Sequence, residues 1–265
     1  MPETIATDAI EHFADQLAQA WVDRRPIVDA PPVLLTDRQD GYRVQDMMAR
    51  RIGEPVVGWK AGATSEGMRR RDGHDGIVPG RVFSSGLFVG AAHRLDAASY
   101  PGGMLEPEFA YRFLESPGLR TDWTAEDLGP LVAAHVAIEI IGSRMAPALP
   151  PECRGTAMTI ADNGNGFALV IGPEIATDAE YDPLRHPVDL RIDGGPPARN
   201  SPPDIRADPL AALADTVNLL AARGISLDSG NFVTTGSATE TLPVQKGSTV
   251  TADFGGLGTI RLTFN

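Results

Sequence analysis

The sequence predicts an α/β protein of the α+β kind, in which a helical first part precedes a β-rich body. Residues 4–23 carry apolar side chains at helical spacing, whereas the chain after Pro55 consists of short apolar or alternating runs between glycines and prolines. The 265 residues are 42% hydrophobic and 22% charged, which allows a sizeable core. We therefore expect a helical subdomain over residues 1–54 and a main domain over residues 55–265.

Charge and composition exclude several classes of partner. The formal net charge is -12 and the one basic run is Arg69-Arg70-Arg71, so we expect neither nucleic acid nor an anionic membrane as a partner. Cys153 is the single cysteine, which favours a reducing compartment. Residues 1–13 lack the basic and apolar segments of a signal peptide, and no apolar run approaches the length of a membrane span. These features indicate a cytoplasmic protein.

Two helices are expected in the first part of the chain. The apolar stripe of residues 4–23 is made by Ile5, Ile10, Phe13, Leu17, Ala20 and Trp21. Prolines then interrupt the pattern. Thr36 or Asp37 is a suitable N-cap for a second helix, which Gly53 would end.

The body of the chain reads mainly as strands. Candidate strands lie at residues 56–63, 80–90, 104–114, 132–141, 166–173 and 188–192. A further helix is expected after Asp208, an N-cap residue followed by Pro209, and Gly224 would end it. The final segment predicts a strand over 231–237 and then a hairpin closed at Gly255-Gly256. The proline-rich segment 192–207 predicts a surface loop.

Three glutamates interrupt the apolar character of two predicted strands. Pro107 favours extended backbone, so Glu106 and Glu108 would share one face about 7 Å apart, on an edge strand or at a bulge. Glu139 lies in the apolar run VAIEII and cannot be buried without a partner. Three carboxylates from two strands could hold one Mg²⁺ or Mn²⁺. The alternative is that the first two face solvent and that Glu139 pairs with Arg144.

Several motifs together resemble one family. In chain order they are VGWKAGAT (57–64), LEPEFA (105–110), AIEIIGSR (137–144), ADNGNG (161–166), the segment 208–237 ending in TTGS, and VTADFGGLGTIRLTF (250–264). They resemble the hydratase/decarboxylase branch of the fumarylacetoacetate hydrolase superfamily, typified by 2-hydroxypenta-2,4-dienoate (2-keto-4-pentenoate) hydratase, over most of the chain after residue 35. The resemblance implies a mixed β-roll flanked by helices, with a small helical N-terminal part, and a homo-oligomer.

The resemblance also implies a function. It makes Glu106, Glu108 and Glu139 the ligands of Mg²⁺ or Mn²⁺, and residues 55–265 the catalytic domain. The expected reaction adds water to a small 2-hydroxy-2,4-dienoate or 2-oxo-4-enoate and gives a 4-hydroxy-2-oxo acid, in the catabolism of aromatic compounds. The alternative within the same fold is a 2-oxo acid decarboxylase.

Four further residues acquire expected roles from the resemblance. Lys60 would bind or protonate the substrate near its oxo-carboxylate end; the alternative is a strand-end lysine that reaches solvent. Asp162 would orient Lys60 or an active-site water, unless the Asp-Asn-Gly segment is simply a turn. Gly236 and Ser237 would meet a substrate carboxylate, or form only an ordinary strand-to-loop transition.

One arginine is a candidate for a second substrate carboxylate. Arg81 ends a basic cluster with residues 69–71 and His74, and a guanidinium can bind a carboxylate through two hydrogen bonds. The alternative is a solvated basic loop.

One departure from the family pattern keeps the function open. Hydratases of this branch carry Pro-Asp-aromatic-Gly where this chain has Ile77-Val78-Pro79-Gly80, so Val78 replaces an aspartate near the substrate. A decarboxylase, or a non-catalytic partner that keeps the fold and the metal, therefore remains an alternative. An acylpyruvate-type hydrolase is disfavoured, because Glu11-His12 does not resemble the histidine–glutamate pair of those enzymes.

Overall fold

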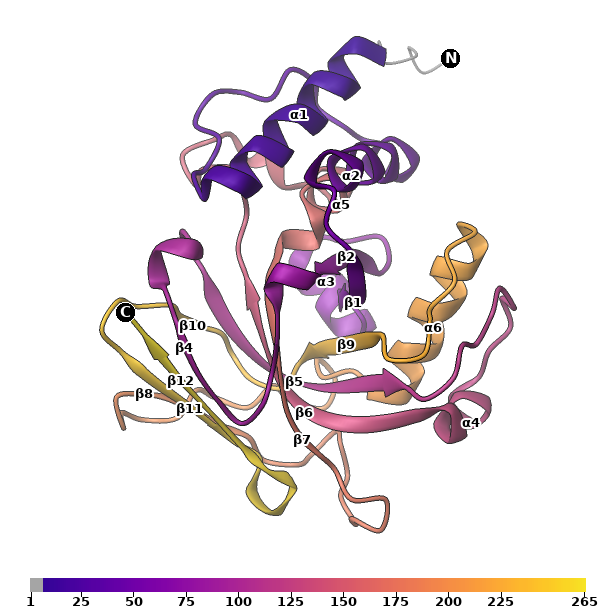
Figure 1. Cartoon of the computed structure of the whole chain (residues 1–265), viewed down its shortest axis with the longest axis vertical. Helices are drawn as coiled ribbons and strands as arrows, with labels where there is room; N and C mark the ends of the chain where they lie inside the picture. The colour runs from indigo at the N-terminus through magenta and orange to yellow at the C-terminus, as the bar shows by residue number, and fades with distance from the viewer. Residues whose placement is uncertain (1–6) are drawn as a thin grey trace.

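The strands form two curled sheets that lie beneath a group of helices in a computed structural model that describes residues 7–265 (Figure 1). Ile5, which the sequence assigns to the first helix, lies outside the described residues. Within residues 7–265 no helix combines the length and the apolar character needed to cross a membrane.

Both N-terminal helices form where the apolar spacing predicts them. Helix α1 is Thr7–Asp23 and helix α2 is Arg38–Ile52. Asp37 is the N-cap of α2, since its side chain accepts a hydrogen bond from the Gln39 N–H at 2.7 Å, and Gly53 ends the helix at a φ of 70°. The apolar face of α1 packs into the same core as the sheets. The boundary between a helical subdomain and a main domain after residue 54 stays a prediction.

The larger sheet is mixed. Its strand order is β2-β1-β9-β5-β6-β7-β3, and the short β10 also pairs with β5. Neighbours are antiparallel except for β1 with β9 and β3 with β7, which are parallel. The strands are β1 Val56–Gly62, β2 Val78–Phe83, β3 Leu87–Val89, β5 Met104–Phe113, β6 Val132–Ile141, β7 Gly166–Glu174, β9 Phe232–Ser237 and β10 Leu242–Pro243.

The smaller sheet covers the concave side of the fold with the C-terminal hairpin. Its strand order is β4-β12-β11-β8. The strands are β4 Ala92–Leu95, β8 Asp189–Ile192, β11 Thr249–Asp253 and β12 Thr259–Phe264. Gly255-Gly256 lies between β11 and β12, so the hairpin is confirmed. Inward side chains of both sheets, with those of α1 and α2, form the largest hydrophobic cluster.

Pro107 does not lie on an edge strand. β5 pairs with β6 on one side and with β9 on the other, so the edge-strand alternative is wrong. A bulge is present instead, because the β5–β9 register shifts between Glu108 and Ala110. The Pro107 carbonyl accepts a hydrogen bond from the Ala238 N–H at 2.8 Å.

Three short helices were not predicted from the sequence. They are α3 Glu66–Asp72, α4 Ala125–Leu128 and α5 Thr156–Ala161. Each is too short for an apolar stripe to show in the sequence. The capping residues of α3 are nevertheless visible in the sequence. The Ser65 side chain accepts a hydrogen bond from the Met68 N–H, and Gly73 ends the helix at a φ of 73°. Single 3₁₀ turns are Ser84–Gly86, Ala97–Ser99, Gly129–Leu131, Pro151–Arg154, Asn163–Asn165 and Gly255–Leu257.

Helix α6, Pro209–Ala222, flanks one end of the larger sheet as the sequence predicts (Figure 1). Its N-cap is Asp208, which accepts from the Ala211 N–H at 3.0 Å, and Gly224 follows its end at a φ of 73°. The segment 192–207 is only partly a surface loop, because Ser201 and Arg206 within it are buried.

Candidate active site

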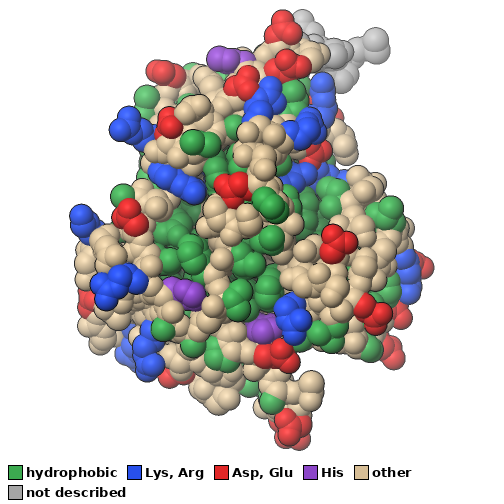
Figure 2. Space-filling model, viewed as in Figure 1, with side chains coloured by type: hydrophobic (Ala, Val, Ile, Leu, Met, Phe, Trp, Pro, Cys, Tyr) green, Lys and Arg blue, Asp and Glu red, His purple; other side chains and the backbone are tan. Residues whose placement is uncertain are grey.

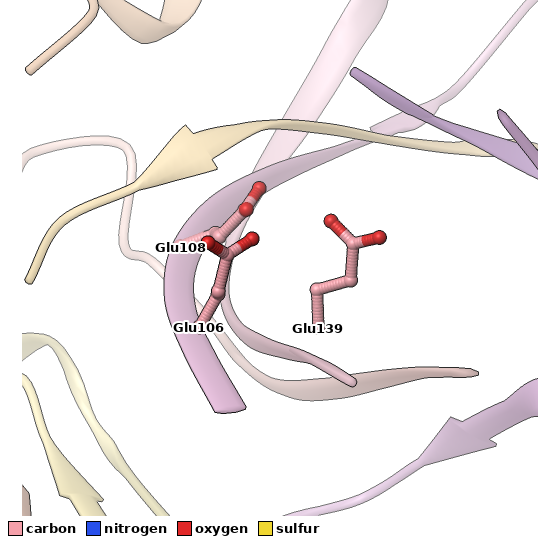
Figure 3. Close-up of side chains that lie close together, drawn as sticks. All are labelled: Glu106, Glu108 and Glu139. Atoms are coloured by element: carbon pink, nitrogen blue, oxygen red, sulfur yellow. The ribbon is translucent and has the colours of Figure 1, made fainter. Parts of the chain in front are cut away.

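Three glutamates meet on one face of the larger sheet. Glu106 pairs directly with Glu139 in the antiparallel register of β5 and β6, and Glu108 follows two residues later on the same face. Figure 3 shows the three carboxylates pointing into a common space, with Glu106 and Glu108 on one strand. One carboxylate oxygen from each residue lies within 4.8 Å of the others. This spacing suits three oxygen ligands of a single cation.

The carboxylates are buried with oxygens that no donor satisfies. Glu108 and Glu139 are 1% and 2% exposed. Glu108 Oε2 accepts from the Thr235 and Gly236 N–H groups at 3.0 and 2.8 Å, but its Oε1 has no hydrogen-bond partner. Neither oxygen of Glu139 has one. Buried carboxylate oxygens without donors are costly, and a hard divalent cation is the group that they fit.

The pKa values of the three glutamates show the same unfavourable environment for their negative charges. Burial raises the pKa of Glu139 to about 7, even though the Lys60 charge works against the shift. Burial, followed by repulsion from Glu139 and Glu106, raises the pKa of Glu108 well above its ordinary range. Burial also raises the pKa of Glu106. A divalent cation would offset these charges without protons.

Lys60 is the cation that the chain itself supplies. It is 5% exposed on β1, and its Nζ lies 3.4 Å from Glu139 Oε1. Burial alone would lower the pKa of Lys60, but the charges of Glu139, Glu106 and Glu108 together outweigh burial and raise it. The alternative of a solvent-reaching lysine is therefore wrong, and the side chain is a buried ammonium beside three carboxylates.

A cavity of about 220 Å³ opens over this cluster. Lys60, Glu106 and Glu108 contribute its charged wall. The end of α3 and the loop after it add a second polar wall, made of Arg71, Asp72 and His74. Apolar surface comes from Met68, Val78 and Ile141, and the remaining polar lining includes Thr159, Asn165, Gly236 and Ser237. The cavity thus joins a charged end to hydrocarbon-lined walls.

Gly236 and Ser237 line the cavity, but both are already engaged. Gly236 has a φ of 106°, and a Cβ there would lie 2.5 Å from Thr64 Oγ1. Its N–H orients Glu108, as described above. The Ser237 hydroxyl donates to the Thr239 carbonyl at 2.9 Å. The direct contribution of the TTGS segment is therefore to hold a triad glutamate, which the sequence did not suggest.

Asp162 has a partner other than the expected one. Its Oδ1 lies 2.9 Å from the Arg144 guanidinium, and its Oδ2 accepts from Ser143 Oγ and from the Arg144 N–H at 2.7 and 2.8 Å. The side chains of Asp162 and Arg144 are buried, with 0% and 1% exposure respectively. No hydrogen bond joins Asp162 to Lys60 within residues 7–265. Near the site, Lys60 therefore pairs with Glu139, and Arg144 pairs with Asp162. The alternative pairing of Glu139 with Arg144 is wrong.

Arg81 does not reach the cavity. Its guanidinium pairs with Asp46, donates to Gln45 Oε1 at 3.0 Å, and lies over the Trp59 ring at 4.8 Å. These contacts leave it committed to α2 and to β1, so it is poorly placed to bind a second substrate carboxylate. Arg71 is the arginine that lines the cavity. Its position follows from helix α3, whose capping residues are the sequence signal that could have revealed it.

Val78 occupies the cavity wall, as its match to the family aspartate implies. It is 2% exposed. Asp75, a carboxylate close to it in sequence, pairs with Arg38 on α2 and does not line the cavity. The additional titratable groups in the wall are instead Asp72 and His74, neither of which sequence reasoning assigned a role.

Replacement of Asp162 by asparagine should destabilise the fold more than it impairs chemistry. The change leaves the Arg144 guanidinium buried without its counter-charge, which typically costs about 3–5 kcal/mol. Thermal unfolding of Asp162→Asn is compared with that of Asp182→Asn, whose carboxylate forms an exposed pair with Arg185. A wild-type melting temperature in Asp162→Asn would contradict this structural role.

Comparison with known proteins gives matches along the whole chain. A 4-oxalocrotonate decarboxylase of a Pseudomonas species is 27% identical, over 95% of this chain and 96% of the relative. A 2-keto-4-pentenoate hydratase of Paraburkholderia phymatum is also 27% identical, over 97% of both chains. That of Burkholderia vietnamiensis is 28% identical, over 97% of this chain and 98% of the relative. No protein-family model matches the chain.

Solved structures share the fold. The 4-oxalocrotonate decarboxylase of Pseudomonas putida G7, in complex with magnesium and adipate, superposes with a TM-score of 0.85 at 22% identity, covering 99% of both chains. A fumarylpyruvate hydrolase of Pseudomonas aeruginosa gives 0.56 at 18% identity, over 80% of this chain and 90% of the other. The predicted mixed β-roll flanked by helices is therefore confirmed. Together these matches confirm the resemblance of the chain to the hydratase/decarboxylase branch of the fumarylacetoacetate hydrolase superfamily.

Proposed function

We propose that this protein is a divalent-metal-dependent hydratase, a carbon–oxygen lyase that adds water to a 2-hydroxy-2,4-dienoate in the catabolism of aromatic compounds. The observation that carries this proposal is the triad of Glu106 with the buried Glu108 and Glu139 beside Lys60, at the charged end of a small cavity. Glu108 Oε1 and both Glu139 oxygens have no hydrogen-bond partner. Relatives named 2-keto-4-pentenoate hydratase and 2-hydroxyhexa-2,4-dienoate hydratase support it.

The proposed reaction converts the dienoate in two stages. The dienol loses the proton of its C2 hydroxyl and gains one at C5, which gives a conjugated 2-oxo-3-enoate. Water then adds across C3 and C4, with its oxygen on C4 and a proton on C3, to give the 4-hydroxy-2-oxo acid. A bound Mg²⁺ or Mn²⁺ on the triad would supply Lewis acidity toward the C1 carboxylate and the C2 oxygen.

The chain's own residues divide this work. The Lys60 ammonium lies at the charged end of the cavity, where it can donate to a substrate oxygen and stabilise the negative charge that develops on the C2 oxygen. The Gly236 and Thr235 N–H groups keep Glu108 aimed at the same point. Met68, Val78 and Ile141 offer apolar surface to the hydrocarbon part of the substrate. The arrangement positions a short 2-oxo acid with its oxygens toward the triad.

A 2-oxo acid decarboxylase is the second candidate. Two observations favour it: Val78 faces the cavity where the resembled hydratases carry an aspartate, and several relatives are named 4-oxalocrotonate decarboxylase. The same oxygen ligands would serve both reactions. The products separate them, because only the decarboxylase releases CO₂.

Four finer points belong to the same proposal. The small substrate would be a 2-oxo or 2-hydroxydienoic acid, and the metal would be Mg²⁺ or Mn²⁺. The protein would work as a homo-oligomer in the cytoplasm. Hydrophobic side chains that gather in the middle of one face, below the helices, offer a surface for self-association (Figure 2).

The first experiment follows the ultraviolet absorbance of freshly generated 2-hydroxypenta-2,4-dienoate with Mg²⁺ or Mn²⁺. Wild type should give the 4-hydroxy-2-oxo acid, identified by mass, whereas Glu106→Gln should lose at least about a hundredfold in kcat, since it removes one anionic ligand. Glu126→Gln, an exposed change on α4, is the control. CO₂ release from a 2-oxo-3-enedioate, tested in parallel, would instead establish the decarboxylase, because the second carboxylate of that substrate can leave with its electrons passing to the C2 oxygen. Bound metal without turnover on either substrate would indicate a non-catalytic partner.

Added metal should stabilise the fold through the triad. At a free concentration one hundred times the Kd, binding adds about 2.7 kcal/mol, which raises the Tm by on the order of 5 °C. Thermal unfolding with and without Mn²⁺ measures the shift, and Glu108→Gln should reduce it. An equal shift in wild type and in Glu108→Gln would place the metal elsewhere.

Arg71 should govern preference for a second substrate carboxylate. Its guanidinium donates twice to the adjacent Asp72, through Nε and Nη2 at 2.7 Å each, which leaves the Nη1 donors to bind a substrate carboxylate. Arg71→Gln should raise the KM for a dicarboxylate roughly tenfold to a hundredfold and leave that for a monocarboxylate unchanged. Arg70→Gln is the matched control, since Arg70 pairs with Glu66 and does not line the cavity. A uniform effect on both substrates would refute the selectivity.

A further inference from the structure

We propose that His74 is the catalytic base of the hydration step, and that its imidazole takes a proton from the water that attacks C4. This inference rests on the proposed hydratase function and names a residue that the family resemblance does not supply. It answers the question that Val78 raises, namely which group of this chain moves the proton where an aspartate is missing.

The position of His74 is fixed by the end of helix α3. Gly73 closes the helix in the left-handed region, and the His74 N–H donates to the Arg69 carbonyl at 3.0 Å. This turn directs the imidazole toward α5, where Nδ1 lies 3.1 Å from Thr156 Oγ1. No hydrogen bond of Nε2 is found within residues 7–265. One ring nitrogen is therefore anchored, and the ring itself lines the cavity.

The other titratable groups of the cavity are already engaged. Lys60 is an ammonium held among the carboxylates, so it has no lone pair to accept a proton. Asp72 receives two hydrogen bonds from Arg71. Glu106 and Glu108 belong to the cation site. Of the cavity groups in the described chain, His74 is the one with a nitrogen lone pair and no competing ionic partner.

The surroundings of His74 keep the imidazole neutral at pH 7. Burial lowers its pKa below the ordinary value of 6.5. The nearby charges oppose one another, because Asp72 and Asp75 raise the pKa whereas Lys60 on β1 and Arg38 on α2 lower it. From α5 the imidazole meets the uncharged Thr156. A neutral ring is the form that can accept a proton, and it is lost as the pH falls through the lowered pKa.

His74 alone can carry the proton through the hydration step. One O–H bond of water breaks and its proton bonds to the imidazole, while the water oxygen forms the C4–O bond. The electron pair of the C3–C4 double bond moves toward C2 and its oxygen. The imidazolium then returns the proton to C3, which restores the carbonyl and the neutral histidine. The net change is addition of one H₂O, with no other reactant.

The first test is His74→Gln, with His12→Gln on the exposed face of α1 as the matched control. Mn²⁺ binding, measured by calorimetry on both variants, should equal that of wild type. The kcat of His74→Gln for hydration should fall about 10²- to 10⁴-fold, the usual contribution of a general base. Its pH–rate profile should lose the acidic limb, which wild type and His12→Gln keep below pH 6.5.

Three further measurements keep the inference testable if His74→Gln folds poorly. Added imidazole should restore part of the kcat of His74→Gly, because the small base can enter the vacated space. Thr156→Val removes the partner of Nδ1 and should lower kcat and move the acidic limb. Independently of turnover, the His74 ring proton of the wild-type protein should titrate below pH 6.5 by NMR.

The outcomes separate this inference from the proposed function. If wild type hydrates the dienoate and His74→Gln does so at a similar rate with the acidic limb intact, His74 is not the base and the hydratase proposal still holds. If wild type hydrates no dienoate, the hydratase proposal fails and this inference falls with it. Loss of kcat with imidazole rescue and wild-type Mn²⁺ binding supports both.

Discussion

The gathering of three carboxylates and one ammonium on a single sheet, with Glu108, Glu139 and Lys60 buried, is the constraint on which the rest of the site depends. Charges of this kind stay in a protein interior only when partners offset their desolvation. Lys60 offsets the charge of Glu139, and the amides of Thr235 and Gly236 donate to one oxygen of Glu108. The other Glu108 oxygen and both Glu139 oxygens have no hydrogen-bond partner. A divalent cation would complete this balance, and the carboxylates that are costly to bury would then hold the metal that the proposed reaction needs.

A second buried ion pair fixes the frame around this site. Arg144 follows β6 and bonds to Asp162 at the end of α5, to the Asp162 carbonyl and to the Gly166 carbonyl at the start of β7. It also lies over the rings of Trp21 and Phe167. One guanidinium thus ties the N-terminal helix, α5 and two strands together. Asp162 serves the site by holding the frame, without a bond to Lys60.

Much of the fold could be predicted from local signals. Periodicity located α1, α2 and α6, their caps gave the ends, and Glu106, Pro107 and Glu108 marked an extended segment with two carboxylates on one face. Glu139 stood out as the third carboxylate because it interrupts the apolar run of residues 136–141, and the family motifs then made all three the expected metal ligands. These features are legible because each depends on neighbours in the sequence or on a motif with known partners.

The second polar wall of the cavity could not be predicted from such local signals. Arg71 and Asp72 end a helix of seven residues, which is too short to show an apolar period, and His74 lies in the loop just after it. The commitment of Arg81 to Asp46, and of Asp162 to Arg144, depends on contacts across long sequence separations. Charged residues in one sequence cluster can face different partners, and only the packing of α2 and α5 against the strands decides which arginine meets the cavity.

The direct pairing of Glu106 with Glu139 ties the site to the alignment of two strands. Side chains alternate between the faces of a strand, so a slip of β5 against β6 by one residue would send one strand's carboxylates to the opposite face. A cation that bridges the three glutamates therefore binds only the correctly aligned pair. Metal binding would therefore stabilise the native register of β5 and β6 relative to every shifted register.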